Sequence, residues 1–183
     1  MKKLLALSVL SLSMLTFGCQ KQAPAPGADS NADQSAAPAA AVNDSAIVAE
    51  LTLAQMDYAK AWSNQDSAFI SNCWSHDENV MLIPPGTRER LVGFDAVWKW
   101  YMDNFYSIEK VDFKIHELMI KVTPDGNSAV ITYYVENDFT DKATGKKMKM
   151  TPRVCVVKTK QNGEWKQIYG DASFSVAELT KKK

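Results

Sequence analysis

Residues 74–80, with the sequence WSHDENV, place an aromatic ring, a histidine and two carboxylates within seven positions. An imidazole held beside a carboxylate can move protons in general acid–base catalysis. Successive side chains of an extended segment point in opposite directions, so Asp77 points away from His76 and Glu78 and the three cannot serve one site. His76 and Glu78 fit the solvated end of a helix, where a histidine interacts favourably with the helix dipole. Asp77 lies on the opposite side of this segment.

The N-terminal residues have the organisation of a secretory signal. Two lysines precede an apolar stretch, residues 4–17, that is too short to span a bilayer comfortably. The sequence LTFGC, residues 15–19, resembles the lipobox of bacterial lipoproteins, in which a small residue precedes a cysteine. The resemblance implies removal of residues 1–18, acylation of Cys19 and attachment to a membrane of the bacterial cell envelope. Gln20, where the inner-membrane sorting pattern has aspartate, favours the periplasmic face of the outer membrane in a Gram-negative cell. An ordinary signal peptide is the alternative.

The next segment lacks what a folded domain needs. Residues 20–44 are mainly Ala, Pro, Ser, Gln, Asn and Asp without an aromatic side chain, so they bury too little apolar surface to order themselves. We expect residues 19–44 to form a flexible tether and residues 45–183 to form one domain. After removal of residues 1–18, 19 basic residues face 21 acidic ones. This balance gives no basic surface of the kind that binds nucleic acid.

Cys73 and Cys155 are the cysteines that remain if Cys19 is acylated. In an oxidising compartment they could form a disulfide. They could also be two small buried side chains, because the sequence does not show whether their Cα atoms come within bridging distance. The chain has no CxxC motif and no His/Cys cluster with zinc-ligand spacing. We expect neither a metal nor another cofactor.

Apolar side chains recur at helical spacing in the first part of the domain. Residues 47–62 carry one such stripe. Asp66 can cap a second, shorter helix whose apolar face lies within Phe69–Trp74. After a brief extended segment at residues 80–83, a third amphipathic helix is expected over residues 94–105.

The apolar period then changes to about 2, which indicates strands. The stretch 111–122 changes parity near His116, and such a change is the mark of a β-bulge that bends the strand. Three further strands, with a hairpin turn at Asn162-Gly163, are expected over residues 128–139, 148–160 and 164–175. Three helices followed by four long antiparallel strands predict an α+β domain. We expect its curved sheet to wrap the helices and leave a cone-shaped cavity.

Several short stretches follow one another in a particular order along residues 46–175. They are WSNQD (62–66), WSHD (74–77) before a Pro-Gly turn, Gly93, RVCVV (153–157) and NGEWKQI (162–168). In this order they resemble the NTF2-like superfamily, in its SnoaL-like and DUF4440-like branch. The resemblance implies a cone-shaped fold whose cavity binds small, often hydrophobic molecules. Members include isomerases, cyclases, dehydratases and non-catalytic binding or dimerisation modules, so the fold alone assigns no function.

Ketosteroid isomerase-like members of the superfamily offer a catalytic pattern to compare. They carry an aspartate base on the strand before the Pro-Gly turn, where this chain has Leu82 and Ile83. They carry a second acid on the third strand, where Pro152–Val157 has none. Their tyrosine, eight residues before the aspartate after the first helix, is matched by Tyr58 and Asp66. Enolisation needs a base as well as a donor for the oxyanion, so this chain departs from the isomerase pattern where the chemistry requires it.

Other branches carry a cavity arginine on the third strand and a His-x-Ser near the end of the fourth. Arg153 matches the arginine, while Asp171-Ala172-Ser173 keeps the serine and replaces the histidine. Asp171 and Ser173 share one face of their strand. Arg153 and Asp171 could form a stabilising ion pair between neighbouring strands. If both face the cavity, they could instead orient the polar end of a ligand.

The principal expectation is an envelope lipoprotein whose domain binds a small apolar or amphipathic molecule. The side chains expected in its cavity are aromatic ones on the second long strand together with Tyr58, Trp62, Trp74, Trp98 and Tyr101.

Two other functions remain open. One is an isomerase or lyase that acts on a small hydrophobic substrate with a site built from Tyr58, Asp77, Arg153, Asp171 and Ser173. The other is a non-catalytic module whose outer sheet face forms a homodimer or docks an envelope protein. The candidates for that face are Val130, Tyr134 and Val156.

Overall fold

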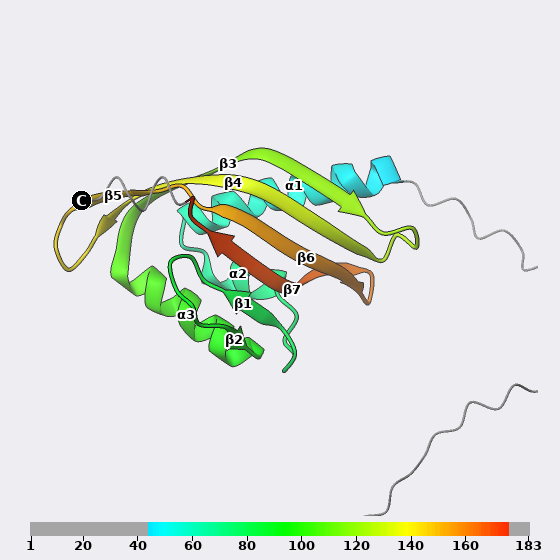
Figure 1. Cartoon of the computed structure of the whole chain (residues 1–183), viewed down its shortest axis with the longest axis horizontal. Helices are drawn as coiled ribbons and strands as arrows, with labels where there is room; N and C mark the ends of the chain where they lie inside the picture. The colour runs from blue at the N-terminus through cyan, green and yellow to red at the C-terminus, as the bar shows by residue number, and fades with distance from the viewer. Residues whose placement is uncertain (1–43, 176–183) are drawn as a thin grey trace, which may run out of the picture. The chain divides into compact units, whose positions relative to one another are not determined.

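A computed structural model describes residues 44–175 of the chain (Figure 1). The expected signal peptide, Cys19 and nearly all of the expected tether lie outside these residues. The helices are α1 (Asp44–Ser63), α2 (Ser67–Cys73) and α3 (Phe94–Ser107), and they precede the long strands as predicted. The α+β class is therefore confirmed. Within residues 44–175, no helix is long and apolar enough to cross a membrane.

The strands of this region join one sheet. In chain order they are β1 (Met81–Ile83), β2 (Leu91–Val92), β3 (Ile108–Val122), β4 (Ser128–Asp141), β5 (Lys147–Met150), β6 (Arg153–Gln161) and β7 (Glu164–Ser173). Their order in space is β2-β1-β7-β6-β4-β3, and β5 pairs with the end of β4 that β6 does not reach.

One edge of the sheet corrects the prediction of a purely antiparallel sheet. β1 runs parallel to β7, with Leu82 opposite Gly170, and the chain before it joins the same strand through a bridge between Trp74 and Gln167. β2, which the sequence did not predict, then pairs antiparallel with β1. The sheet is therefore mixed. Strands of two or three residues are too short to show a period, and the pairing direction of distant segments leaves no local signal.

Local signals mark the ends of several elements. The side chain of Asp66 accepts a hydrogen bond from the backbone N–H of Phe69 at 3.0 Å and caps α2 as predicted. Gly93 adopts a φ of 87° at the start of α3, a conformation that residues with a Cβ rarely adopt. Asn162 and Gly163, with φ values of 52° and 88°, form the predicted hairpin turn between β6 and β7.

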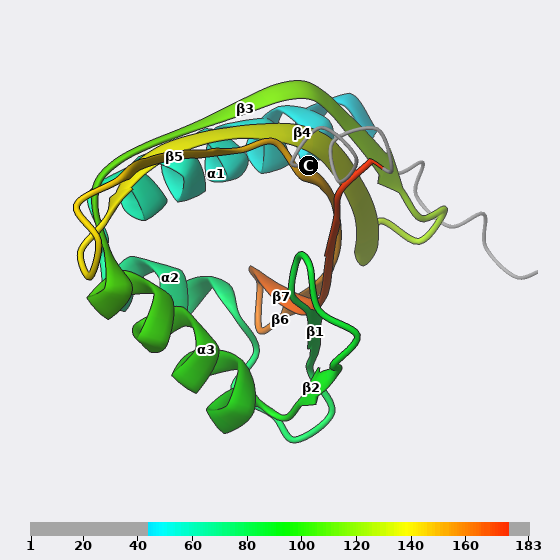
Figure 2. The ribbon, with the colours of Figure 1, turned by 60° about the vertical axis from the view of Figure 1, so that its left-hand side comes forward.

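Irregularities in β3 bend the sheet, which arches over α1 (Figure 2). The register of β3 against β4 shifts between His116 and Met119, and Glu117 between them has a φ of 51°. This is the bulge that the change of parity predicted. A second shift lies nearer α3, around Lys110, whose φ is 53°. The bulges allow a strand of 15 residues to curve around the helices.

The third long strand expected over residues 148–160 is interrupted and forms two strands, β5 and β6. Thr151 and Pro152 separate them. Proline has no N–H to contribute to a ladder. Its carbonyl oxygen does accept a hydrogen bond from the backbone N–H of Val135, at 2.9 Å. Both strands still pair with β4, so the break at Pro152 bends this part of the sheet without ending it.

The two faces of the sheet differ in burial, most clearly along β4. Alternate residues from Ala129 to Val135 are at most 3% exposed, whereas Val130 and Tyr134 are 41% and 47% exposed on the opposite face. Val156 was expected on the outer face, and this expectation was wrong. It is 2% exposed and lies opposite Ile131, because the pairing of β6 with β4 decides which of its side chains face inward.

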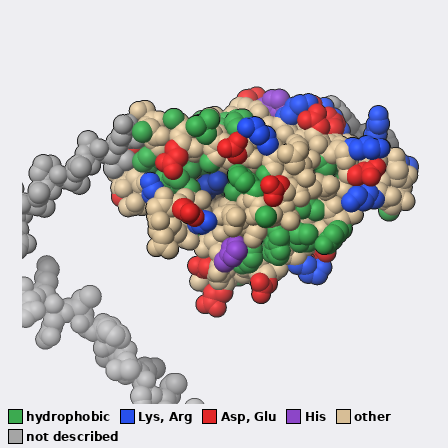
Figure 3. Space-filling model, turned by 180° about the vertical axis from the view of Figure 1, so that it is seen from behind, with side chains coloured by type: hydrophobic (Ala, Val, Ile, Leu, Met, Phe, Trp, Pro, Cys, Tyr) green, Lys and Arg blue, Asp and Glu red, His purple; other side chains and the backbone are tan. Residues whose placement is uncertain are grey.

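Surface charge on the domain is mixed. In Figure 3, which shows the side opposite to that of Figure 1, acidic and basic side chains are interspersed. Ion pairs such as Lys60 with Asp57 and Lys99 with Asp103 join well-exposed side chains and contribute little to stability. The stability of the domain therefore comes mainly from its buried apolar clusters.

Candidate functional site

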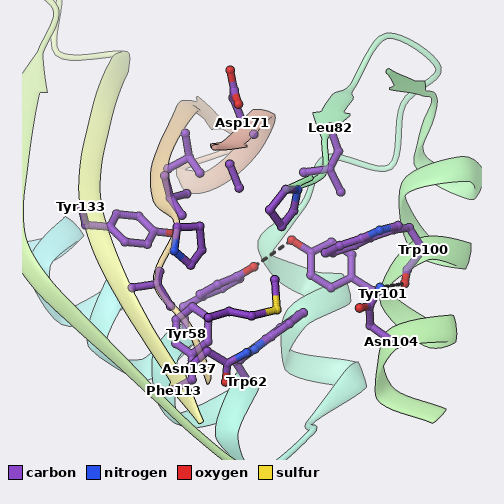
Figure 4. A pocket seen from close by; sticks show the side chains of 18 of the residues that line it. Tyr58, Trp62, Leu82, Trp100, Tyr101, Asn104, Phe113, Tyr133, Asn137 and Asp171 are labelled. Atoms are coloured by element: carbon purple, nitrogen blue, oxygen red, sulfur yellow. Dashed lines mark hydrogen bonds between the residues drawn. The ribbon is translucent and has the colours of Figure 1, made fainter. Parts of the chain in front are cut away.

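A cavity of about 120 Å³ lies between the helices and the concave face of the sheet (Figure 4). Its walls come from α1, α3, β1 and the long strands. The aromatic side chains that line it are Tyr58, Trp62, Trp100, Tyr101, Phe113, Tyr133 and Phe139. An apolar, aromatic cavity with a few polar groups is the usual form of a small-molecule site, so this cavity is the candidate functional site.

Three of the five side chains expected in the cavity, Tyr58, Trp62 and Tyr101, line it, and two do not. Trp74 is 1% exposed and packs against Tyr101, with ring centroids 6.1 Å apart, outside the cavity wall. Trp98 packs with Phe94 on a flank of α3 instead. The apolar stripe of an amphipathic helix is wider than the part that reaches any one cavity, so the stripe alone cannot select the lining residues.

Two tyrosine hydroxyls meet in the cavity wall. The Oη atoms of Tyr58, on α1, and Tyr101, on α3, lie 2.8 Å apart (Figure 4). Burial raises the pKa of Tyr101 to about 12 and the pKa of Tyr58 well above its ordinary value of 10.0. Burial also raises the pKa of Tyr133, the third phenol in the wall. These phenols therefore stay protonated near neutral pH and can donate hydrogen bonds, but they cannot act as bases there.

The cavity is electrically neutral. Asp171 contributes to the wall, but its carboxylate points away from the rings (Figure 4), and its Oδ2 accepts a hydrogen bond from the hydroxyl of Tyr169 at 3.4 Å. Besides the phenols, the wall contains three amide side chains, those of Asn104, Asn137 and Gln167. Sequence reasoning missed these amides, because a single amide in a helix or strand carries no periodic signal. The arrangement suits an uncharged ligand.

The pairing of β6 with β7 places Arg153 and Ser173 on the outer face. Arg153 lies opposite Ser173 and donates a hydrogen bond to its Oγ at 3.4 Å, whereas Cys155 lies opposite Asp171. Among the described residues, no ion pair joins Arg153 to Asp171, so the expected pair does not form. Arg153 borders a separate surface hollow with His116. Side chains alternate between the two faces of a strand, so on β6 and β7 the residues that line the cavity are the intervening ones, Val154 and Ala172.

The opening stretch WSHDENV has a structural role. Asp77 is exposed, and its Oδ1 accepts a hydrogen bond from the backbone N–H of Asn79 at 2.6 Å. Its backbone oxygen accepts one from Phe94, the first residue of α3, at 3.1 Å. The exposed ring of His76 stacks on Phe94 with centroids 3.8 Å apart. Asp77 is therefore absent from the cavity wall and joins the end of α2 to the start of α3.

Cys73 and Cys155 are free thiols. Cys73, the last residue of α2, packs against the inner core, whereas Cys155 shares the outer face with Arg153, so the sheet separates them. The possible disulfide is therefore not formed. Burial raises the pKa of both thiols. Within residues 44–175, no three His, Cys, Asp or Glu side chains are grouped to bind a metal ion.

Replacing Tyr101 by phenylalanine is expected to reduce the loss of stability at alkaline pH. The folded protein keeps the Tyr101 proton up to about pH 12, whereas the unfolded chain releases it near 10.0. The contribution of this proton to stability is therefore complete below 10.0 and is lost as the pH rises through about 12. Within this window the wild-type free energy of unfolding should fall more steeply than that of Tyr101→Phe, by at most about 1.4 kcal/mol per pH unit.

Urea unfolding followed by tryptophan fluorescence at several pH values measures the two slopes. Tyr106→Phe, at a tyrosine that is 72% exposed on the same helix, is the matched control. Equal slopes for the wild type and Tyr101→Phe would show that the buried phenol does not carry this dependence.

The chain matches known proteins over most of the region that the structure describes. The family model of the SnoaL-like domain matches residues 53–177. An NTF2-like family protein from Streptomyces avermitilis, provisionally named a dehydratase, is 19% identical with a TM-score of 0.63, over 72% of this chain and 98% of that one. An NTF2-like superfamily protein from Salmonella enterica is 19% identical with a TM-score of 0.65, and the match covers 74% of this chain and 98% of that one. A ketosteroid isomerase-like protein from Erwinia carotovora is 21% identical with a TM-score of 0.56, and the match covers 67% of this chain and 91% of that one. No curated protein matches the chain.

These solved structures share the NTF2-like fold with the chain, and at such identities the likeness concerns the fold alone. The family model spans more than half of the chain. The chain therefore belongs to the family of proteins that carry a SnoaL-like domain, within the NTF2-like fold.

Proposed function

We propose that the domain binds a small, uncharged, apolar or amphipathic ring compound in the cavity between the helices and the sheet. The observation that carries the proposal is the chemistry of the wall, with seven aromatic side chains, three amides and no charged side chain directed inward. An apolar cavity of about 150 Å³ can hold benzene. A cavity of about 120 Å³ therefore suits a single six-membered ring with few substituents, provided that the side chains adjust slightly.

Binding fits this wall better than isomerase or lyase chemistry. The buried phenols of Tyr58 and Tyr101 can polarise a ligand oxygen. Proton transfer also needs a base within hydrogen-bond reach of the substrate. Leu82 occupies the wall near the position where the isomerases carry theirs, and the carboxylate of Asp171 points away. We therefore place binding ahead of catalysis.

Filling the cavity is expected to abolish binding of an apolar ring probe. Toluene should bind the purified full-length protein and change its tryptophan fluorescence, because Trp62 and Trp100 line the cavity. Ala172→Leu adds volume to the wall and should weaken toluene binding by about tenfold or more. Ser173→Leu, one residue further along β7 and on the opposite face, is the matched control.

Titration of toluene into the wild type, Ala172→Leu and Ser173→Leu measures the affinity of each protein for the probe. Absence of binding to the wild type, or equal affinity in Ala172→Leu and Ser173→Leu, would remove the proposal that the cavity is the site.

We also propose that an acylated Cys19 holds the domain at the bacterial cell envelope. The support is the sequence of the leader and its LTFGC ending. Mass spectrometry of the protein from a bacterial host should show a mature chain that begins at Cys19 with a diacylglyceryl group. Cys19→Ser should keep residues 1–18 and carry no lipid, whereas Cys73→Ser should be processed like the wild type. A mature chain with an unmodified Cys19 would contradict the anchor.

A homodimer through the outer face of the sheet is a third proposal, favoured by two exposed side chains. Val130 and Tyr134 project from β4 and are 41% and 47% exposed. Sedimentation equilibrium of the full-length protein should show a dimer that Tyr134→Lys shifts to monomer. Tyr106→Lys, at an exposed tyrosine on α3, should leave the dimer intact. A wild type that remains monomeric at every concentration would exclude this interface.

A further inference from the structure

Two polar atoms in the cavity wall have no hydrogen-bond partner within the described part of the chain. They are the indole Nε1 of Trp62, which is a donor, and the Oδ1 of Asn137, which is an acceptor. Their side chains are 7% and 8% exposed, so water does not readily replace a partner. A buried polar atom without a partner costs stability, and each one in a folded protein calls for an explanation.

Both atoms belong to the same part of the wall. Phe113, on β3, lies directly opposite Asn137, on β4, so their side chains share the inner face. The ring of Trp62 packs on Phe113, with centroids 5.6 Å apart. Trp62 and Asn137, which carry the free donor and the free acceptor, are therefore both neighbours of Phe113 in the cavity wall.

Several other polar groups of the wall form hydrogen bonds within the protein. The hydroxyls of Tyr58 and Tyr101 bond to each other. The amide of Asn104 donates to the backbone oxygen of Trp100 at 2.8 Å. Trp165 also has an indole N–H without a partner, but it lies outside the cavity wall. In the cavity wall, the donor of Trp62 and the acceptor of Asn137 are thus the buried side-chain atoms that lack a partner among the described residues.

We propose that this pair makes the cavity selective for a ring whose edge carries an N–H beside a C=O, as in a cyclic amide. The inference rests on the proposed ligand-binding function. The ligand N–H donates to Oδ1 of Asn137, and the ligand C=O accepts from Nε1 of Trp62. A carboxylate fits poorly, because it has no hydrogen for Asn137 and the wall offers no cation. A purely apolar ring fits the space but leaves both atoms unpaired.

Matched probes test the selectivity on the wild-type, full-length protein. Calorimetric titration should show 2-pyridone binding about tenfold more tightly than N-methyl-2-pyridone, which lacks the donor. The isomer 4-methyl-2-pyridone has the same size as the N-methyl compound but keeps the N–H, and it should retain the tighter binding. Asn137→Leu should bring the ratio of the two methyl isomers close to one. Trp62→Phe should weaken 2-pyridone by about tenfold, whereas Trp165→Phe, which removes an unpartnered N–H elsewhere, should not.

Toluene separates failure of this inference from failure of the proposed function. Toluene binding together with equal affinities for the two methyl isomers would overturn the selectivity and leave the cavity as an apolar binding site. Absence of binding by toluene and by every pyridone would overturn both. Binding of the N–H pyridones alone would support the selectivity and show that the hydrogen bonds are required for affinity.

Discussion

The ring of Trp62, on α1, lies against four other aromatic rings, with centroid separations from 4.9 to 6.4 Å. Three of these rings, those of Trp100, Tyr101 and Phe105, belong to α3, and the fourth, Phe113, belongs to β3. Each aromatic pair contributes roughly 0.5–1.5 kcal/mol beyond the burial of its area. One indole therefore fixes α1 against both α3 and the sheet, and the same side chain is part of the cavity wall. The contact that holds the domain together and the contact that shapes the site are the same.

The chemistry of the cavity follows from burial. Desolvation keeps the phenols of Tyr58 and Tyr101 protonated, and one hydrogen bond joins their hydroxyls. Asn137 and Trp62 instead retain unpaired polar atoms, which reduce stability in the empty protein. A ligand that pairs with them would recover part of that cost. The site thus differs from an ordinary core in a few polar atoms and not in its overall composition.

Because the sheet is curved, these side chains line one shared cavity. The bulge at Glu117 and the break at Pro152 bend β3 and the β5–β6 line, and the concave face then encloses space beside the helices. Side chains alternate between the two faces of each strand. Ala172 therefore faces the cavity, whereas the polar candidates Arg153 and Ser173 face outward. A register different by one residue would exchange these two sets.

The sequence by itself determined the elements that depend on neighbouring residues. The cap at Asp66, the start of α3 at Gly93, the turn at Asn162-Gly163 and the bulge near His116 all agree with the structure. The change of period from helix to strand was enough for the α+β class, because periodicity records which face of an element is buried. The order of these elements also indicated the family.

Only the tertiary structure decided which side chains meet. The parallel pairing of β1 with β7, the outward direction of Arg153 and the place of Trp74 outside the cavity each depend on a partner far away in the chain. The same holds for Asn137, which is part of the site only because Phe113 and Trp62 are brought beside it. Local sequence fixes the alternation along a strand, but the pairing with other strands fixes which half of that alternation faces the cavity.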